Sequence, residues 1–260
     1  MGKTPITRIL PPFRPFLLNI WGIMPPFFYL RHMIDYRSDT VTRPSKEMLV
    51  RMHQAPVGDD VFMEDPSINT LEKFISEMFG MEAGLFCPSG TMTNQLAIKC
   101  HTNAGDEVIC DELSHIYQYE GGGIAFNSGA SVRLLRGDRG RITANQVVMS
   151  INPDDIHKPP STLVSLENTV NRAGGSIYQL TDIKLIKEVC STKNLALHLD
   201  GARLFNALVA TGDTAISYGE TFDSISICLS KGLGAPIGSL LLGNGSFIKK
   251  AKRFRKVFGG

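Results

Sequence analysis

One lysine stands between an apolar run and a glycine-rich turn, in the stretch SISICLSKGLGAPIGS at 224–239. If Lys231 follows a buried strand, leaving its ammonium group there without a partner is costly. Burial favours the neutral form of a lysine, and a neutral amine can form an imine with an aldehyde. A lysine at a strand end can also extend its charge to solvent. This position alone leaves both interpretations open.

An aspartate ends the predicted strand LALHLD at 195–200, and Gly201, Ala202 and Arg203 follow at once. Ligand sites in parallel sheets lie beyond the carboxyl ends of the strands, so Asp200 could face the same crevice as the lysine. A carboxylate there can hold a proton on a heterocyclic nitrogen, which a pyridoxal phosphate ring needs to act as an electron sink. The alternative role for this carboxylate is to cap the next helix.

Two further segments carry groups that suit the same chemistry. The sequence CPSGTMTNQLAIK at 87–99 opens a predicted helix with Ser89, Gly90 and Thr91, whose free N–H groups can bind a phosphate. His115, in DELSHIYQYEGGG, follows a predicted strand, where an imidazole can stack on a cofactor ring and move protons near neutral pH. The alternative for Ser89 and Thr91 is that they only cap the helix. The alternative for His115 is an ordinary surface or core histidine.

The predicted scaffold alternates strands with helices. Apolar residues recur with helical spacing after Pro66, and a second helix, LTDIKLIKEVCSTKN, carries a candidate cap at Thr181 or Asp182. Short apolar runs predict strands at 107–111, 161–167, 195–200, 222–230 and 238–243. This order indicates an α/β fold with a mostly parallel sheet covered by helices on both faces.

The composition is that of a globular chain of 260 residues with 43% hydrophobic residues and a net charge of +2. Such a weak charge disfavours a nucleic-acid binder, so a small molecule or another subunit is the expected partner. Five cysteines without a CxxC motif predict neither a disulfide framework nor a zinc site, and we expect no metal. Buried apolar cysteines in a reducing compartment fit best.

Residues 1–34 differ from the rest of the chain, because they are basic, contain no acidic residue and hold six of the fourteen prolines. Pro25 and Pro26 interrupt their apolar run FLLNIWGIMPPFFYL, which is short for a membrane span. Two interpretations stay open for this segment: a targeting segment, or a disordered or alternatively initiated leader, since Met33 stands just before the globular pattern begins.

Seven segments occur in order along the chain: YRSDTVTRPS, VGDDVFMEDPSINTLE, PSGTMTNQLAI, SHIYQYEGGG, LENTVNRAGG, HLDGARLFNA and CLSKGLGAPIGS. Together they are far more specific than any one of them. They resemble the threonine aldolase family, in the group of pyridoxal phosphate enzymes with the aspartate aminotransferase fold. The resemblance covers nearly all of residues 35–260 and implies that they form the cofactor-binding large domain.

Carried over by position, the resemblance implies a complete cofactor site. Lys231 is similar to the lysine that holds the cofactor as an imine, and Asp200 is similar to the acid that faces the pyridine nitrogen. Gly90 and Thr91 match the phosphate-binding turn, and His115 matches the imidazole that stacks on the ring.

Three further positions complete the predicted site. Ser230, next to the lysine, is expected to contribute to cofactor binding. Ser38 and Arg203 look like the groups that hold the substrate carboxylate, a role for which the arginine fork is well suited.

The reaction implied by the resemblance is retro-aldol cleavage of L-threonine or L-allo-threonine to glycine and acetaldehyde. It belongs to threonine catabolism and glycine biosynthesis, and His115, acting directly or through water, is the expected proton mover. The family also implies a cytosolic homotetramer, or a mitochondrial enzyme if residues 1–34 act as a transit peptide. The alternatives are a β-eliminating lyase acting on an aromatic amino acid and a truncated, non-catalytic paralogue.

The sequence departs from the family in three places. It ends at RFRKVFGG, where members continue into a small carboxyl-terminal domain that we expect to be missing here. Phe62 and Met63 stand where many relatives have Tyr-Gly, and Val170 stands where many have His. Because phenylalanine cannot donate the tyrosine's hydroxyl hydrogen bond, we expect an effect on substrate affinity more than on cofactor chemistry.

Overall fold

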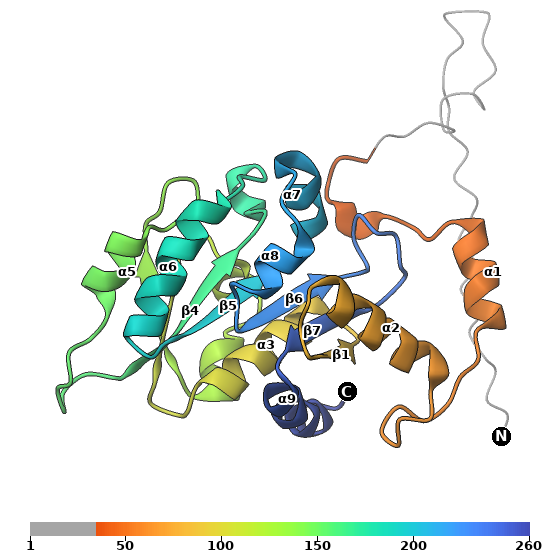
Figure 1. Ribbon diagram of the computed structural model, residues 1–260, viewed down its shortest axis with the longest axis horizontal. Coiled ribbons are helices and arrows are strands. Elements are labelled where there is room, and N and C mark those ends of the chain that lie inside the picture. Colours follow the sequence, from red (N-terminus) through yellow and green to blue (C-terminus); the bar gives the residue numbers. More distant parts are fainter. Residues whose placement is uncertain (1–34) are drawn as a thin grey trace, which may run out of the picture. The chain divides into compact units, whose positions relative to one another are not determined.

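The computed structural model describes residues 35–260, so the leader predicted at 1–34 lies outside the described residues. The chain divides into two compact units, Met1–Ser38 and Asp39–Gly260. The helices and strands described below all belong to the second unit (Figure 1). Within the described residues, no helix has the length and apolar character needed to cross a membrane.

The second unit is built on a seven-stranded sheet in the order β1-β7-β6-β5-β4-β2-β3. Neighbouring strands from β3 to β6 pair in parallel, whereas β7 is antiparallel to both of its neighbours. The strands are β1 (Ala83–Cys87), β2 (Glu107–Asp111), β3 (Ser131–Leu135), β4 (Ser161–Glu167), β5 (Ala196–Asp200), β6 (Ser224–Cys228) and β7 (Ser239–Gly243). The predicted α/β class with a mostly parallel sheet is therefore confirmed.

The five predicted strands are all present, and two more were not foreseen. β3 is an edge strand with no fully buried residue, so it shows none of the apolar run that marks the others. β1 is only five residues long and contains Gly84, which lies close to the backbone of Glu72 in helix α2 (Pro66–Met78). The predicted strand at 222–230 is shorter in the structure, because β6 ends at Cys228.

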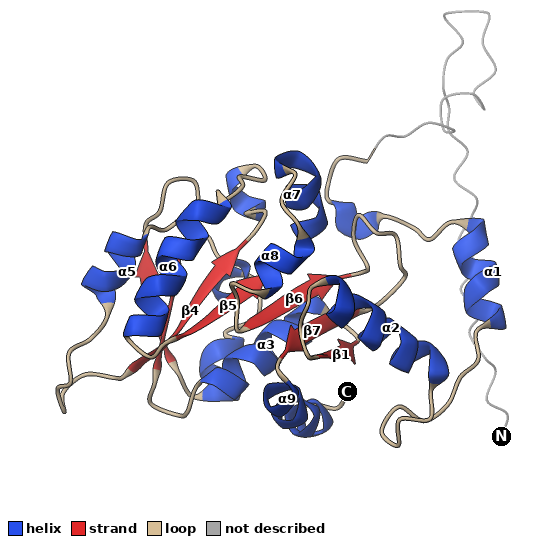
Figure 2. Ribbon diagram, viewed as in Figure 1, coloured by secondary structure: helices blue, strands red, loops and turns tan. Residues whose placement is uncertain are grey.

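Helices cover both faces of the sheet (Figures 1 and 2). The helices are α1 (Lys46–Gln54), α2 (Pro66–Met78), α3 (Gly90–His101), α4 (His115–Gln118), α5 (Ala144–Ser150), α6 (Leu180–Thr192), α7 (Leu204–Thr211), α8 (Ala215–Gly219) and α9 (Gly245–Val257). One apolar core packs α2, α5, α6, α7 and α8 against one face, and two smaller cores pack α3, α4 and α9 against the other.

The three predicted helices are present as α2, α3 and α6, with one error in a cap. α2 begins at Pro66 after Asp65, whose side chain accepts hydrogen bonds from the first free N–H groups. α6 begins earlier than expected, with Gln179 as its N-cap, so the cap predicted at Thr181 or Asp182 is wrong. Asp182 lies instead in the first turn, where its charge faces the positive end of the helix.

The face of the sheet that α3 crosses is unusually polar. Alternation in the sequence SISIC turns Ser224 and Ser226 toward α3 and the two isoleucines toward the larger core. The Oγ1 atom of Thr93 lies 2.5 Å from Ser226 Oγ. His198 Nδ1 and His101 Nε2 each lie 2.8 Å from Ser224 Oγ. A buried polar layer thus joins α3 to β5 and β6.

Two histidines of this layer are neutral in the folded protein. Burial lowers the pKa of His198 to about 3 and the pKa of His101 to about 4. A histidine in the unfolded chain has a pKa near 6.5, so acid protonates the unfolded state first. The stability that these neutral rings contribute is present above pH 6.5 and is lost as the pH falls toward about 4.

We expect the free energy of unfolding to fall by about 2 kcal/mol for each histidine between neutral pH and about pH 5. Urea unfolding at the two pH values measures this loss. The variant His101→Gln keeps an N–H donor but does not titrate, so its stability should fall less than that of the wild type. An equal fall in the two proteins would show that His101 is not held neutral.

Candidate active site

A cavity of about 190 Å³ lies beyond the carboxyl ends of β5 and β6, beside the start of α3. All six residues predicted to bind a cofactor line it, although they come from four separate segments of the chain. The lining residues are Ser89, Gly90, Thr91, Asn94, His115, Asp200, Ala202, Cys228, Ser230 and Lys231. The parallel topology thus brings together the residues that the sequence marked for one site.

The amino terminus of α3 forms one wall of the cavity. Ser89 is its N-cap, and the serine Oγ accepts a hydrogen bond from Met92 N at 3.2 Å. A side chain at Gly90 would place its Cβ 2.5 Å from the Sγ atom of Cys228, so only glycine allows the helix to start this close to β6. The free N–H groups and the dipole of this first turn suit a phosphate.

Asp200 is the last residue of β5 and is buried. Its Oδ1 accepts a hydrogen bond from Ala202 N at 3.1 Å, and its Oδ2 accepts one from Asn94 Nδ2 at 2.9 Å. The next helix, α7, begins only at Leu204 and uses Arg203 as its N-cap. The alternative role as a helix cap is therefore wrong, and the carboxylate remains an acceptor that faces the cavity.

Lys231 lies in the loop that joins β6 to β7 and is half-buried. The loop is closed by backbone hydrogen bonds, among them one from Gly234 N to Lys231 O at 2.9 Å. Gly234 has a φ of +79°, a left-handed conformation that glycine adopts without strain. Because the strand ends at Cys228, the lysine and Ser230 belong to this turn and both reach the cavity.

His115 begins α4 and is fixed at two points. Its backbone N donates to Glu167 Oε2 at 2.8 Å, and its Nδ1 lies 3.0 Å from Glu120 Oε1. Because a carboxylate oxygen accepts, Nδ1 carries the hydrogen and Nε2 is left to exchange a proton. The hydrogen bond to Glu120 raises the pKa of His115, which makes this imidazole a stronger base than a free one.

Two acidic residues of the site were missed by the sequence reasoning. The side chain of Glu120 is fully buried and accepts hydrogen bonds from Asn94, Gln95 and His115. Asn94 and Gln95 could have indicated an acidic partner in the sequence, because adjacent amides in a buried helix need hydrogen-bond acceptors.

Glu167 is the second missed acid, and it lies beside Asp200 in the register of β4 and β5. Burial, followed by the charge of Asp200, raises the pKa of Glu167 to about 7. Its oxygens accept hydrogen bonds from the backbone N–H groups of His115 and Asn171. As the last residue of a predicted strand, Glu167 satisfied the same end-of-strand rule that marked Asp200.

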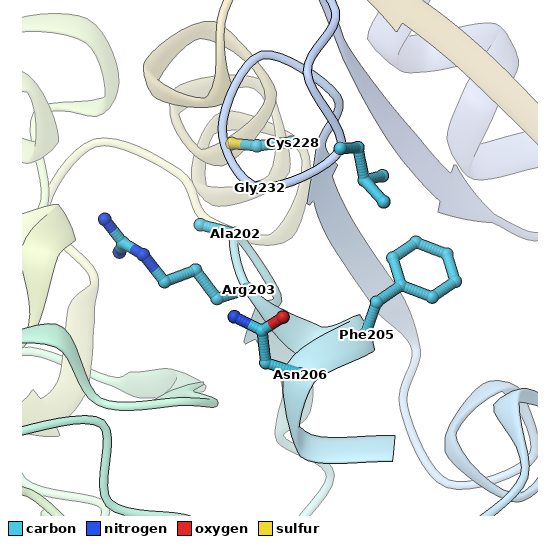
Figure 3. Close-up of a pocket in the computed structure, with 7 residues that line it drawn as sticks. Ala202, Arg203, Phe205, Asn206, Cys228 and Gly232 are labelled. Atoms are coloured by element: carbon cyan, nitrogen blue, oxygen red, sulfur yellow. The ribbon is translucent and has the colours of Figure 1, made fainter. Parts of the chain in front are cut away.

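Arg203 lies at a small neighbouring cavity of about 60 Å³ that shares Ala202 and Cys228 with the main one (Figure 3). Its Nε and Nη2 atoms donate to the two oxygens of Asp39 at 2.8 and 2.6 Å, and this pairing raises the pKa of Arg203. The fork predicted to hold a substrate carboxylate therefore holds a carboxylate of the chain itself. Ser38 belongs to the amino-terminal unit, so its place in the site stays a prediction.

The residues that depart from the family do not line the cavity. Phe62 is 73% exposed, and the neighbouring Met63 has a φ of +60°, a left-handed conformation that glycine adopts with less strain than methionine. Val170 is buried in the larger core, and its Cγ1 would lie 2.5 Å from a Cβ placed on Gly140. In this chain the side chain at 170 fills a packing space.

Comparison with known proteins agrees with this geometry. The model of the beta-eliminating lyase family matches residues 35–260. A low specificity L-threonine aldolase of Escherichia coli is 46% identical over 229 residues, which cover 88% of this chain and 68% of that protein. The chain belongs to the threonine aldolase group of this family.

Other members of the group extend the comparison. The low specificity L-threonine aldolase of Saccharomyces cerevisiae is 44% identical over 89% of this chain and 60% of its own length. A solved threonine aldolase of Leishmania major has the same fold, with a TM-score of 0.75 and 22% identity, and the match covers 84% of this chain and 66% of that one. This family member thus spans about two thirds of the length of these relatives.

The contact between Gly90 and Cys228 predicts a paired effect on stability. Gly90→Ala should lower the free energy of unfolding by about 1–3 kcal/mol, because the added methyl group overlaps the sulfur. In the double variant with Cys228→Ala the overlap is removed, so most of the loss should be recovered. Chemical denaturation of the four proteins gives the coupling energy, and additive effects would contradict the contact.

Proposed function

We propose that this chain holds pyridoxal 5'-phosphate and cleaves L-threonine or L-allo-threonine to glycine and acetaldehyde. The observation that carries the proposal is the arrangement around one cavity of an amine, an acid and a helix amino terminus. They are supplied by Lys231, Asp200 and the Gly90 turn, and membership of the threonine aldolase group supports the same activity.

The residues at the cavity fit each part of the cofactor. Lys231 supplies an amine for its aldehyde, and the first turn of α3, with Gly90 and Thr91, supplies N–H donors for its phosphate. Asp200 supplies a buried acceptor for its ring N–H, and Ser230 adds a hydroxyl beside the lysine. Pyridoxal phosphate, when bound, supplies the electron sink that allows the Cα–Cβ bond of the substrate to break.

His115 is the group that we assign to proton movement. Its Nδ1 is bound to Glu120, so its Nε2 can accept the proton of the substrate's β-hydroxyl, directly or through water. The raised pKa of His115 favours this role as a base. Because a protonated imidazole cannot accept, we expect activity to fall as the pH drops through the pKa of His115.

Arg203 is the group that we assign to the substrate carboxylate, together with Ser38. The guanidinium already forms a two-point contact with Asp39, so its fork has the geometry that a carboxylate requires. In this arrangement the substrate carboxylate binds by replacing that of Asp39. Substrates without an α-carboxylate are therefore poor competitors for this position.

The threonine aldolase family also suggests an oligomeric state and a cellular location for this chain. We propose a homotetramer in the cytosol that serves threonine catabolism and glycine formation, with residues 35–260 as the cofactor-binding domain. Exposed apolar side chains, such as those of Phe62 and Phe74, support association between subunits. A mitochondrial location remains the alternative if residues 1–34 direct import.

Lys231→Ala should remove the visible absorbance of bound pyridoxal phosphate and lower the rate of threonine cleavage about a hundredfold or more. Lys249→Ala, which changes an exposed lysine on α9, is the matched control and should retain both properties. Retention of the absorbance band in Lys231→Ala would contradict the assignment of Lys231 as the residue that binds the cofactor aldehyde.

The reaction products distinguish the two lyase activities. Formation of pyruvate and ammonia from an aromatic amino acid, without glycine and acetaldehyde from threonine, would favour a β-eliminating lyase.

Arg203→Lys should raise the KM for L-threonine about tenfold or more, because an ammonium group cannot form the two parallel contacts of the fork. The absorbance of the bound cofactor should stay unchanged. Arg255→Lys alters an arginine that binds Asp60 away from the cavity, so its KM should match that of the wild type. An unchanged KM in Arg203→Lys would remove this arginine from the substrate site.

A further inference from the structure

Three buried side chains connect Asp200 to the interior of the sheet. They are Asn94 of α3, His198 of β5 and Ser224 of β6, and none is more than 2% exposed. Asn94 Nδ2 lies 2.9 Å from Asp200 Oδ2, and Asn94 Oδ1 lies 3.2 Å from His198 Nε2. His198 Nδ1 lies 2.8 Å from Ser224 Oγ. The three residues form one continuous chain of hydrogen bonds that ends at the carboxylate.

The donor and acceptor of each hydrogen bond can be assigned by starting from Asp200, because an ionised carboxylate can only accept. Asn94 Nδ2 has two hydrogens and donates to Asp200 Oδ2 and Glu120 Oε1, each at 2.9 Å. Its Oδ1 must then accept, so His198 Nε2 carries a hydrogen. Burial keeps the ring of His198 neutral by lowering its pKa to about 3. The other nitrogen, Nδ1, therefore accepts from the hydroxyl of Ser224.

His101 completes the chain at its far end. Ser224 donates its hydrogen to His198 Nδ1, so its oxygen accepts the hydrogen bond from His101 Nε2 at 2.8 Å. From His101 to Asp200, each donor thus points toward the carboxylate. Hydrogen bonds aligned in this way strengthen one another in a buried environment.

The same carboxylates belong to a cluster that could be taken for a metal site. Ligand atoms of His115, Glu120 and Asp200 lie within 4.8 Å of one another. The amide of Asn94, however, donates one hydrogen to each of the two carboxylates, and His115 donates to Glu120 as well. A cation among these atoms would face N–H donors, so the geometry favours a hydrogen-bonded cluster.

We propose that Asn94 and His198 are positioning residues that fix the carboxylate of Asp200 toward the ring nitrogen of the cofactor. Asn94 holds Oδ2 while Ala202 N holds Oδ1, so the two contacts prevent the carboxylate from turning away. His198 in turn fixes which way the amide of Asn94 faces. The identity of the ring rests on the proposed function, whereas the direction of the hydrogen bonds does not.

The direction can be tested without the cofactor. Nitrogen-15 NMR of the full chain should show that His101 and His198 are neutral at about pH 6, where a free histidine is largely charged, each with its hydrogen on Nε2. The signal of His198 is the one that should disappear in His198→Gln and change in Asn94→Ala. A hydrogen on Nδ1 of His198, or titration of this ring near its ordinary range, would overturn the proposed chain.

The effect on the cofactor is tested by titrating each full-length variant with pyridoxal phosphate. Asn94→Ala should raise the dissociation constant about tenfold or more, because it removes a hydrogen bond to the charged Asp200. His198→Leu should also raise it about tenfold, because it leaves the Asn94 Oδ1 atom without its donor and frees the amide to turn away from Asp200. His198→Gln should stay within about threefold of the wild type, because a glutamine amide can accept from Ser224 and donate to Asn94.

Thr102→Val is the matched control for Asn94→Ala. Thr102 is the buried C-cap residue of α3, and its hydroxyl donates to Ile98 O at 2.8 Å, at the opposite end of the helix from the cavity. This variant should lower stability but leave the dissociation constant unchanged. Equal weakening of cofactor binding by Thr102→Val and Asn94→Ala, or by His198→Gln and His198→Leu, would show that these side chains act only through packing.

The experiments also separate this inference from the proposed function. If the wild-type chain bound no pyridoxal phosphate, the cofactor assignment would fail, while the NMR result would still decide the direction of the hydrogen bonds. If the wild type binds the cofactor and Asn94→Ala binds it equally well, the positioning role fails and the proposed function stands.

Discussion

The site depends on how α3 is held against the polar face of the sheet. A helix that packs on strands normally does so with apolar side chains, yet Thr93, Asn94 and Gln95 are all buried here. Each finds a hydrogen-bond partner on a strand or on the loop that carries Glu120. Such a layer stabilises the fold only when every group is satisfied, because a buried polar group without a partner is costly. Because each buried polar side chain must keep its partner, the position of α3 is fixed. The position of the turn at its amino terminus is fixed with it.

The contacts of α3 also fix three segments that line the cavity relative to one another. The start of α3, the end of β5 and the loop after β6 are far apart in the chain, but hydrogen bonds of the polar layer cross-link the first two. The third is set by packing, since Cys228 touches the position where Gly90 has no side chain. Residues of α3, β5 and β6 therefore hold the walls of the cavity, and such elements define geometry more closely than loops do. Lys231 and Ser230 reach this cavity from the loop that follows β6.

Much of the fold was predictable from local patterns, because the buried strands are apolar runs and α2 has a clear helical period with a cap. β3 was missed since an edge strand with partly exposed residues lacks that run. Lys231, Asp200, the Gly90 turn and His115 were found because their types and positions at strand ends suggest chemistry. Their partners were harder to find. Asn94, Glu120 and His198 act through hydrogen bonds between segments that are distant in the sequence, so local spacing does not predict their partners. Alternation in HLD and SIS does predict that the polar side chains of each strand lie on one face of the sheet.

Cys228 has a consequence for the selectivity of the cavity. Its thiol lines the same space as the amine of Lys231, and thiols as well as amines add to aldehydes. Burial raises the pKa of Cys228, so the sulfur stays protonated and is a weak nucleophile. The sulfur can therefore pack against the start of α3 without giving the aldehyde of the proposed cofactor a second reactive partner.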